Sequence, residues 1–202
     1  MFEIDGLKSL KYNDLNKKEI LKDYIFNNES IELDKNVELK RCKFDGIIFD
    51  EVNIKFGILE EVEFINCDLS NLSFIDTHIF RVHFRNCKLF GTNFIDTTLD
   101  NVIIEDCMCS MSNFTGVKIQ NSRISDSNFK SSNIESSELK NIILDRVNFS
   151  NSIFSKTPLK DIDLSSSNIE EINIDLNCIK GSIISLEQTM DLIGLLGVKF
   201  KE

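Results

Sequence analysis

The sequence contains no tryptophan, and its 202 residues include only one proline, eight glycines and two histidines. So few prolines and glycines leave no place for an obvious interdomain linker, and we expect a single core. No apolar run approaches the ~18 residues that a membrane span needs. The first residues also lack the basic region and apolar stretch of a secretory signal. We therefore expect a cytoplasmic protein whose six cysteines are reduced.

Positive charge is also in the minority, with 23 Lys and Arg against 33 Asp and Glu and a formal net charge of -10. A protein that binds nucleic acid directly shows a basic patch, so this balance argues against that class. An acidic chain fits a basic protein partner. The same charge is also explained by solubility alone.

What the sequence does have is a repeat. Every fifth residue from Leu39 to Ile184 is apolar, through thirty positions and without an insertion. A second column, two residues earlier in each repeat, holds small or β-branched residues such as Val62 and Cys67. A period of five is neither the 3.6 of a helix nor the 2 of a strand. Two inward and three outward residues in each repeat predict a chain that turns a corner every five residues.

The two ends lie outside this frame. At the C-terminus, Ser185 and Gln188 have the spacing of a capping box. The helix that follows would present an apolar face. This apolar face consists of Leu186, Met190, Ile193 and Leu196. It either covers the last coil or forms a two-fold dimer contact, and we favour the dimer contact. At the N-terminus we predict a capping segment over residues 1–36. Within it Asp14 would begin a short helix with an apolar side made of Ile20, Leu21, Tyr24 and Ile25.

Several outward positions of the early repeats hold large apolar residues instead of polar ones. We expect the N-terminal segment to pack over some of them, and the competing interpretation is an exposed functional patch. These residues are Phe56, Ile75, Phe80, Phe90 and Ile95.

The residues that could carry chemistry do not form a recognisable site. Cys67, Cys87 and Cys107 recur every twenty residues but lack a second ligand type, which favours small core residues over a zinc site. We expect His78 and His83 to be surface histidines, since neither belongs to a nucleophile motif. The adjacent acid pairs, such as Glu105–Asp106, favour a solvated face. We predict no catalytic residue, no cofactor and no metal, and hence no enzyme.

The outward charges are divided unequally among the four sides of the expected coil. One side has seven acids against four bases, and the side rich in lysine has seven bases against six acids. Such a distribution produces a modest directional field. The candidate contacts with a basic partner are Asp45, Glu63, Asp76, Asp96, Glu105, Asp106, Asp126, Asp145 and Asp163.

The pattern of a small residue, Asn or Asp, Leu or Phe and two polar residues resembles the pentapeptide-repeat family. The stretches FIDTTL, CKLFGTNF and SNFTGVKI show it, and the resemblance covers residues 37–184. It implies an all-β fold: a right-handed, four-sided parallel β-helix over 37–184, followed by a C-terminal helix and tail over 185–202. With neighbouring strands ~4.8 Å apart, such a solenoid is about 35 Å long.

Within this family the chain resembles the Qnr-type quinolone-resistance proteins of Gram-positive bacteria. The segment FRVHFRNCKLFGTNFIDTTLDNVIIEDC at 80–107 and the ending GSIISLEQTMDLIGLLGV at 181–198 carry the likeness. The resemblance implies a homodimer joined through the C-terminal helices. It further implies a DNA mimic that binds DNA gyrase or topoisomerase IV and protects the enzyme from quinolones. Several Gram-negative relatives have projecting loops that interrupt the repeat, whereas the repeat here is unbroken.

Two other functions remain open. An immunity protein that shields a topoisomerase from a toxin or a natural antibiotic would use the same surface. A non-catalytic scaffold with an unrelated partner is the second. Such an immunity protein would differ from a quinolone-resistance protein only in the compound against which it protects the topoisomerase.

Overall fold

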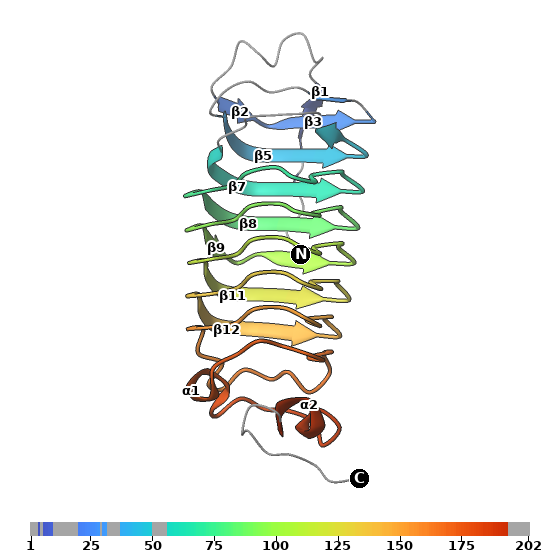
Figure 1. Cartoon of the computed structure of the whole chain (residues 1–202). Coiled ribbons are helices and arrows are strands. Elements are labelled where there is room, and N and C mark those ends of the chain that lie inside the picture. Colours follow the sequence, from blue (N-terminus) through green and yellow to red (C-terminus); the bar gives the residue numbers. More distant parts are fainter. Residues whose placement is uncertain are drawn as a thin grey trace.

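The computed structural model describes residues 4, 6–9, 20–28, 30–31, 37–49 and 56–193. These residues form one stack of parallel coils with two short helices at its C-terminal end (Figure 1). The strands are β1 (Lys8–Ser9), β2 (Ile20–Lys22), β3 (Tyr24–Asn27), β4 (Ser30–Ile31), β5 (Val37–Asp45), β6 (Ile48–Phe49), β7 (Phe56–Ile65), β8 (His78–Arg85), β9 (Thr98–Asp100), β10 (Ile103–Glu105), β11 (Lys118–Ser125) and β12 (Glu138–Asp145). The helices are α1 (Leu176–Ile179) and α2 (Thr189–Ile193).

From Leu39 onward, the pairing register places each residue beside the residue twenty positions further along the chain. Leu59, Ile79, Leu99, Ile119 and Leu139 form one such column across β7, β8, β9, β11 and β12. Four five-residue repeats therefore complete one coil, and the predicted four-sided β-helix is confirmed. β5, β7, β8, β11 and β12 each bend around one corner and cover two sides of their coil, while isolated bridges link the other two sides.

The core is a set of columns in which like residues stack on like. Phe94 is almost fully buried between Phe74 and Phe114, with ring centroids 5.0 and 4.6 Å apart. The small column contributes hydrogen bonds as well as space, because its hydroxyls reach backbone groups of the preceding coil. Thr92 Oγ1 donates to Leu69 O at 2.9 Å. Burial and these bonds together hold adjacent coils in register.

Most corners of the coils are made by a residue in the left-handed backbone region. Asn101, Asp106, Asn121 and Asp126, for example, have φ values of 57°, 54°, 51° and 50°. Asn and Asp adopt this conformation more readily than other non-glycine residues, which explains why they recur at the fifth position.

The N-terminal helix expected around Ile20 to Ile25 is wrong. β2 and β3 instead form a further coil on β5, in which Leu21 pairs with Leu39 and Phe26 with Phe44. Both Leu21 and Phe26 are buried, and the rings of Phe26 and Phe44 stack at 4.9 Å. The pairing offset here is eighteen residues instead of twenty, so the apolar positions continue at a period of five in a shifted frame. Asp14 lies outside the described residues.

The outward apolar residues behave differently from one another. Ile75 and Phe90 are 46% and 44% exposed, so no described part of the N-terminal segment covers them. Phe80 and Ile95 are half-buried, and the guanidinium of Arg81 lies 4.7 Å from the centre of the Phe80 ring. The side chain of Phe56 lies outside the described residues.

The C-terminal capping box is present, although the helix α2 begins only at Thr189. Ser185 N donates to Gln188 Oε1 at 2.8 Å, and Gln188 N donates to Ser185 Oγ at 3.3 Å. The buried Gln188 also donates through Nε2 to Leu164 O at 2.8 Å. This side chain therefore ties the start of the C-terminal element to the body of the β-helix.

Candidate functional site

Most of the predicted acidic contacts lie on one side of the β-helix, which we call the acidic wall. It is formed by β10 and by the last residues of β5, β7, β8, β11 and β12, and continues past Asp163. Asp45, Glu63, Glu105, Asp145 and Asp163 project from this wall. Asp106 and Asp126 stand at its edge, at corners of successive coils. Asp76 and Asp96 are also corner residues, but they belong to a different edge.

The register does not gather these acids into an unbroken column. Glu63 pairs with Lys43 in the preceding coil, with 3.6 Å between Oε2 and Nζ. Asp145 accepts from Arg123 Nη2 at 3.0 Å and Arg146 Nη1 at 2.9 Å. Arg146 also donates to both carboxylate oxygens of Asp126, at 2.6 and 2.8 Å. Much of the negative charge of the acidic wall is thus balanced by a base on an adjacent coil.

The remaining acids are less compensated. Asp45 accepts a hydrogen bond from Asn66. The Ser165 hydroxyl and the backbone N–H of Ser165, which donates to Asp163 at 2.9 Å, lower the pKa of Asp163. Asp106 is exposed and its carboxylate makes no hydrogen bond or ion pair with another described residue. Asp126 also has a lowered pKa, because the Arg146 guanidinium binds its charged form. The carboxylates of Asp126 and Asp163 are therefore ionised at neutral pH.

The expectation that His83 is a surface residue is wrong. Its side chain is only 5% exposed, and Nε2 lies 2.9 Å from Glu105 Oε1, although the two groups are not aligned for a hydrogen bond. His83 occupies the same column as Glu63 and Ile103, and the side chains of neighbouring coils cover it. His78 is exposed, as expected.

The cysteines are core residues, as predicted. All six are buried free thiols. Burial raises the pKa of Cys42 to about 11, and hydrogen bonding with the Cys107 thiol, followed by burial, raises the pKa of Cys87 to about 12. In the part of the chain that the structure describes, no group of three His, Cys, Asp or Glu side chains could hold a metal ion.

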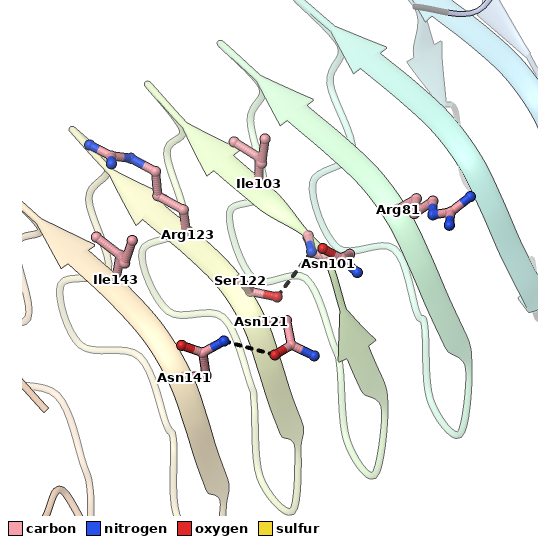
Figure 2. A pocket seen from close by; sticks show the side chains of 9 residues that line it. Arg81, Asn101, Ile103, Asn121, Ser122, Arg123, Asn141 and Ile143 are labelled. Atoms are coloured by element: carbon pink, nitrogen blue, oxygen red, sulfur yellow. Dashed lines mark hydrogen bonds between the residues drawn. The ribbon is translucent and has the colours of Figure 1, made fainter. Parts of the chain in front are cut away.

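A groove of about 490 Å³ lies along one corner of the β-helix (Figure 2). This corner separates the acidic wall from the neighbouring side, which contains the first residues of β8, β11 and β12. We call this groove the corner groove. Its lining contains two arginines and three asparagines but no acidic residue: Arg81, Asn101, Val102, Ile103, Asn121, Ser122, Arg123, Asn141 and Ile143. Sequence reasoning missed this site. The recurrence of Asn at 101, 121 and 141 was the available signal, because twenty residues is one coil.

The predicted dimer face is partly exposed. Leu186 and Met190 are 89% and 63% exposed, and Ile193 is half-buried. Leu192, which the prediction did not include, packs against the core. Leu196 lies outside the described residues. No helix within the described ranges is long and apolar enough to cross a membrane.

Comparison with known proteins agrees with this geometry. The family profile described as "Pentapeptide repeat region" matches residues 35–114 and 57–134. A search of curated proteins found no significant match.

Among solved structures, the chain is similar to HetL, a pentapeptide repeat protein involved in heterocyst differentiation regulation from the cyanobacterium Nostoc sp. strain PCC 7120. That match has 14% identity and a TM-score of 0.49, and covers 82% of this chain and 83% of HetL. Full-length QnrB1, a plasmid-mediated fluoroquinolone resistance protein, is similar with 16% identity and a TM-score of 0.40, over 95% of each chain. With its five-residue period, its twenty-residue coils and the matching profile, this chain belongs to the pentapeptide-repeat family.

Proposed function

We propose that this protein binds a type II topoisomerase, DNA gyrase or topoisomerase IV, by imitating duplex DNA, and thereby protects the enzyme from quinolones. The observation that carries the proposal is a narrow β-helix with one predominantly acidic wall. Its layers from Phe26 to Ile184 extend over roughly 38 Å at ~4.8 Å per coil. The likeness of residues 80–107 and 181–198 to Qnr-type proteins supports the same partner.

The charge density of such a mimic would be lower than that of DNA. Two chains joined end to end would extend over about 76 Å, and a duplex of that length carries about 45 phosphate charges. The formal charge of a dimer is -20, twice that of one chain. Because ion pairs on adjacent coils balance Asp126 and Asp145, affinity would depend on matched positions instead of total charge, and should fall with added salt.

We further propose that the chain dimerises through the C-terminal element. Leu186 and Met190 are exposed apolar side chains at the end of the β-helix, where an end coil would otherwise be open. Replacing both with aspartate should convert a dimer into a monomer in size-exclusion chromatography with light scattering. A wild-type chain that is already monomeric at micromolar concentration would reject this element of the proposal.

The central test is a supercoiling assay with each enzyme and an inhibitory concentration of quinolone. Wild-type protein should restore supercoiling. The variant Asp106→Asn/Asp126→Asn, which keeps residues suited to the left-handed corners, should require about tenfold more protein, a loss of about 1.4 kcal/mol in binding.

The matched control is Glu170→Gln/Glu171→Gln, which removes the same charge from two exposed residues on another side. It should protect as well as the wild type. If neither enzyme is rescued or inhibited by the wild-type protein at any concentration, the topoisomerase proposal fails.

A further inference from the structure

None of the side chains that line the corner groove is one of the candidate topoisomerase contacts, although the rim on β10, β11 and β12 belongs to the acidic wall. One rim is a column of Ile103, Arg123 and Ile143 on β10, β11 and β12. The other rim is the series of corner residues Asn101, Asn121 and Asn141, and Arg81 stands one coil before Asn101 (Figure 2). The floor between the rims contains Val102 and Ser122.

In the floor, Val102 N donates to Ser122 Oγ at 3.0 Å, and that hydroxyl donates to Gln120 O at 2.7 Å, so both donors are satisfied. The asparagines, in contrast, keep hydrogen-bonding capacity. Asn141 Nδ2 donates to Asn121 Oδ1 at 2.8 Å, and Asn121 Nδ2 donates to Asp100 at 3.0 Å. The carboxamide of Asn101 has no partner among the described residues. A carboxamide offers both a donor and an acceptor, which is what a peptide bond requires of its partner.

Both arginines are held in place while most of their donors stay available. Arg81 Nη1 donates to Glu61 at 2.9 Å and its guanidinium lies over the Phe80 ring, and Arg123 Nη2 donates to Asp145 at 3.0 Å. A guanidinium has five N–H donors, and these bonds use one in each case. Arginine is the side chain best suited to bind a carboxylate with two parallel hydrogen bonds.

The apolar part of the rim is also available, since Ile143 is 54% exposed and Ile103 is half-buried. The layers from Arg81 to Asn141 span about 14 Å, the length of about four residues of extended chain. The groove volume falls within the range of roughly 300–1,000 Å³ that is usual for binding clefts. A ligand here would meet carboxamides on one side, Arg123 between two isoleucines on the other, and Arg81 at one end.

We propose that the corner groove binds a short, extended, acidic peptide segment of a partner protein. Its backbone amides pair with the carboxamides of Asn101 and Asn141, its carboxylates bind Arg81 and Arg123, and an aliphatic side chain contacts Ile103 and Ile143. This surface is separate from the edge formed by Asp106 and Asp126, and it selects the opposite charge. The peptide site therefore does not depend on topoisomerase binding.

The test uses the full chain labelled with ¹⁵N, because asparagine side-chain amides give their own signals. The probe is the capped peptide Asp-Leu-Asp-Leu-Asp, and the neutral analogue Asn-Leu-Asn-Leu-Asn is the comparison. Saturable shifts confined to the carboxamides of Asn101, Asn121 and Asn141 and to neighbouring amides, with the neutral peptide at least about tenfold weaker, are the expected result.

Two variants and a control locate the site. Arg123→Gln and Ile143→Asp should each weaken peptide binding by about tenfold or more. The first removes the guanidinium that donates to a peptide carboxylate, and the second places an acid on the apolar rim. Lys130→Gln removes an exposed base on another side and should bind the peptide as the wild type does. Spectra without peptide establish that each variant is folded.

Shifts elsewhere on the protein, equal binding of the neutral peptide, or no shift at millimolar peptide would overturn the proposal. So would a short DNA duplex that shifts the same carboxamides and displaces the peptide, because the groove would then be a phosphate site. Failure here leaves the supercoiling assay unaffected, since that assay depends on Asp106 and Asp126.

Discussion

Replacement of Phe94 by alanine tests how strongly the stacked core holds the β-helix together. Phe94 is 0% exposed and its ring stacks on Phe74 and Phe114 at 5.0 and 4.6 Å. It also meets Phe84 edge to face across the core at 6.5 Å. Removing a ring with neighbours on three sides leaves a cavity that the rigid coils cannot close, and such a change costs about 3–5 kcal/mol.

The assay is urea unfolding followed by far-ultraviolet circular dichroism. With an m value of about 2 kcal/mol per molar urea, the midpoint should fall by about 1.5–2.5 M. Phe90→Ala is the matched control, because it removes the same side chain from a position that is 44% exposed. It should change stability by less than about 0.5 kcal/mol.

The position of a residue along the β-helix should also matter. Phe26 is also buried, but it belongs to the N-terminal coil, and among the described residues only the ring of Phe44 stacks on it. Because each coil contacts only its neighbours, Phe26→Ala should loosen residues 20–28 locally and speed their amide exchange, with a smaller midpoint shift than Phe94→Ala. Equal losses for Phe26, Phe90 and Phe94 would refute both the buried-stack reasoning and the coil-by-coil account.

Three further predictions concern protonation and the C-terminal element. Since the pKa values of Cys42 and Cys87 are raised to about 11 and about 12, a thiol reagent at pH 8 should leave these two cysteines unreacted in the native protein and label them in urea. Rapid labelling of either one in the native protein would contradict its burial. Hydrogen bonds from Asn121 and Gln120 lower the pKa of Asp100. The stability that these two bonds provide is therefore fully present above the ordinary aspartate pKa of about 3.9, and it is lost as pH falls through the lowered pKa. Asn121→Ala should raise the pKa of Asp100 in a carboxyl ¹³C titration, and an unchanged pKa would remove that explanation. Gln188→Ala should cost about 1–3 kcal/mol and expose the segment after Ser185 to protease, because Ser167 O and Leu164 O each lose the hydrogen bond from Gln188 Nε2 and only Leu164 O keeps a second one, from Ser167 N. The exposed Thr189→Ala should do neither.

The sequence by itself determined the fold and the core. The inward residues repeat at a period of five, and a chain with that period can bury them only by turning a corner in every repeat. Phe74, Phe94 and Phe114 are twenty residues apart, so their stacking follows from the coil length. The burial of Cys67, Cys87 and Cys107 follows for the same reason. The capping box of Ser185 and Gln188 was also recognisable, because it depends on contacts only three residues apart.

The tertiary structure decided the features that depend on the offset between coils and on the directions of outward side chains. The N-terminal coil pairs with β5 at an offset of eighteen residues. Leu21 and Phe26 are therefore core residues, although they do not fall on the five-residue series that begins at Leu39. The sequence allows the outward charges of each side only to be summed. In the structure, Arg146 forms ion pairs with both Asp126 and Asp145, and Glu105 lies beside the buried His83. The corner groove likewise exists only where Asn101, Asn121 and Asn141 stack beside Arg123. Periodicity specifies which side of the chain faces the core, whereas side-chain contacts across twenty residues determine what the surface can bind.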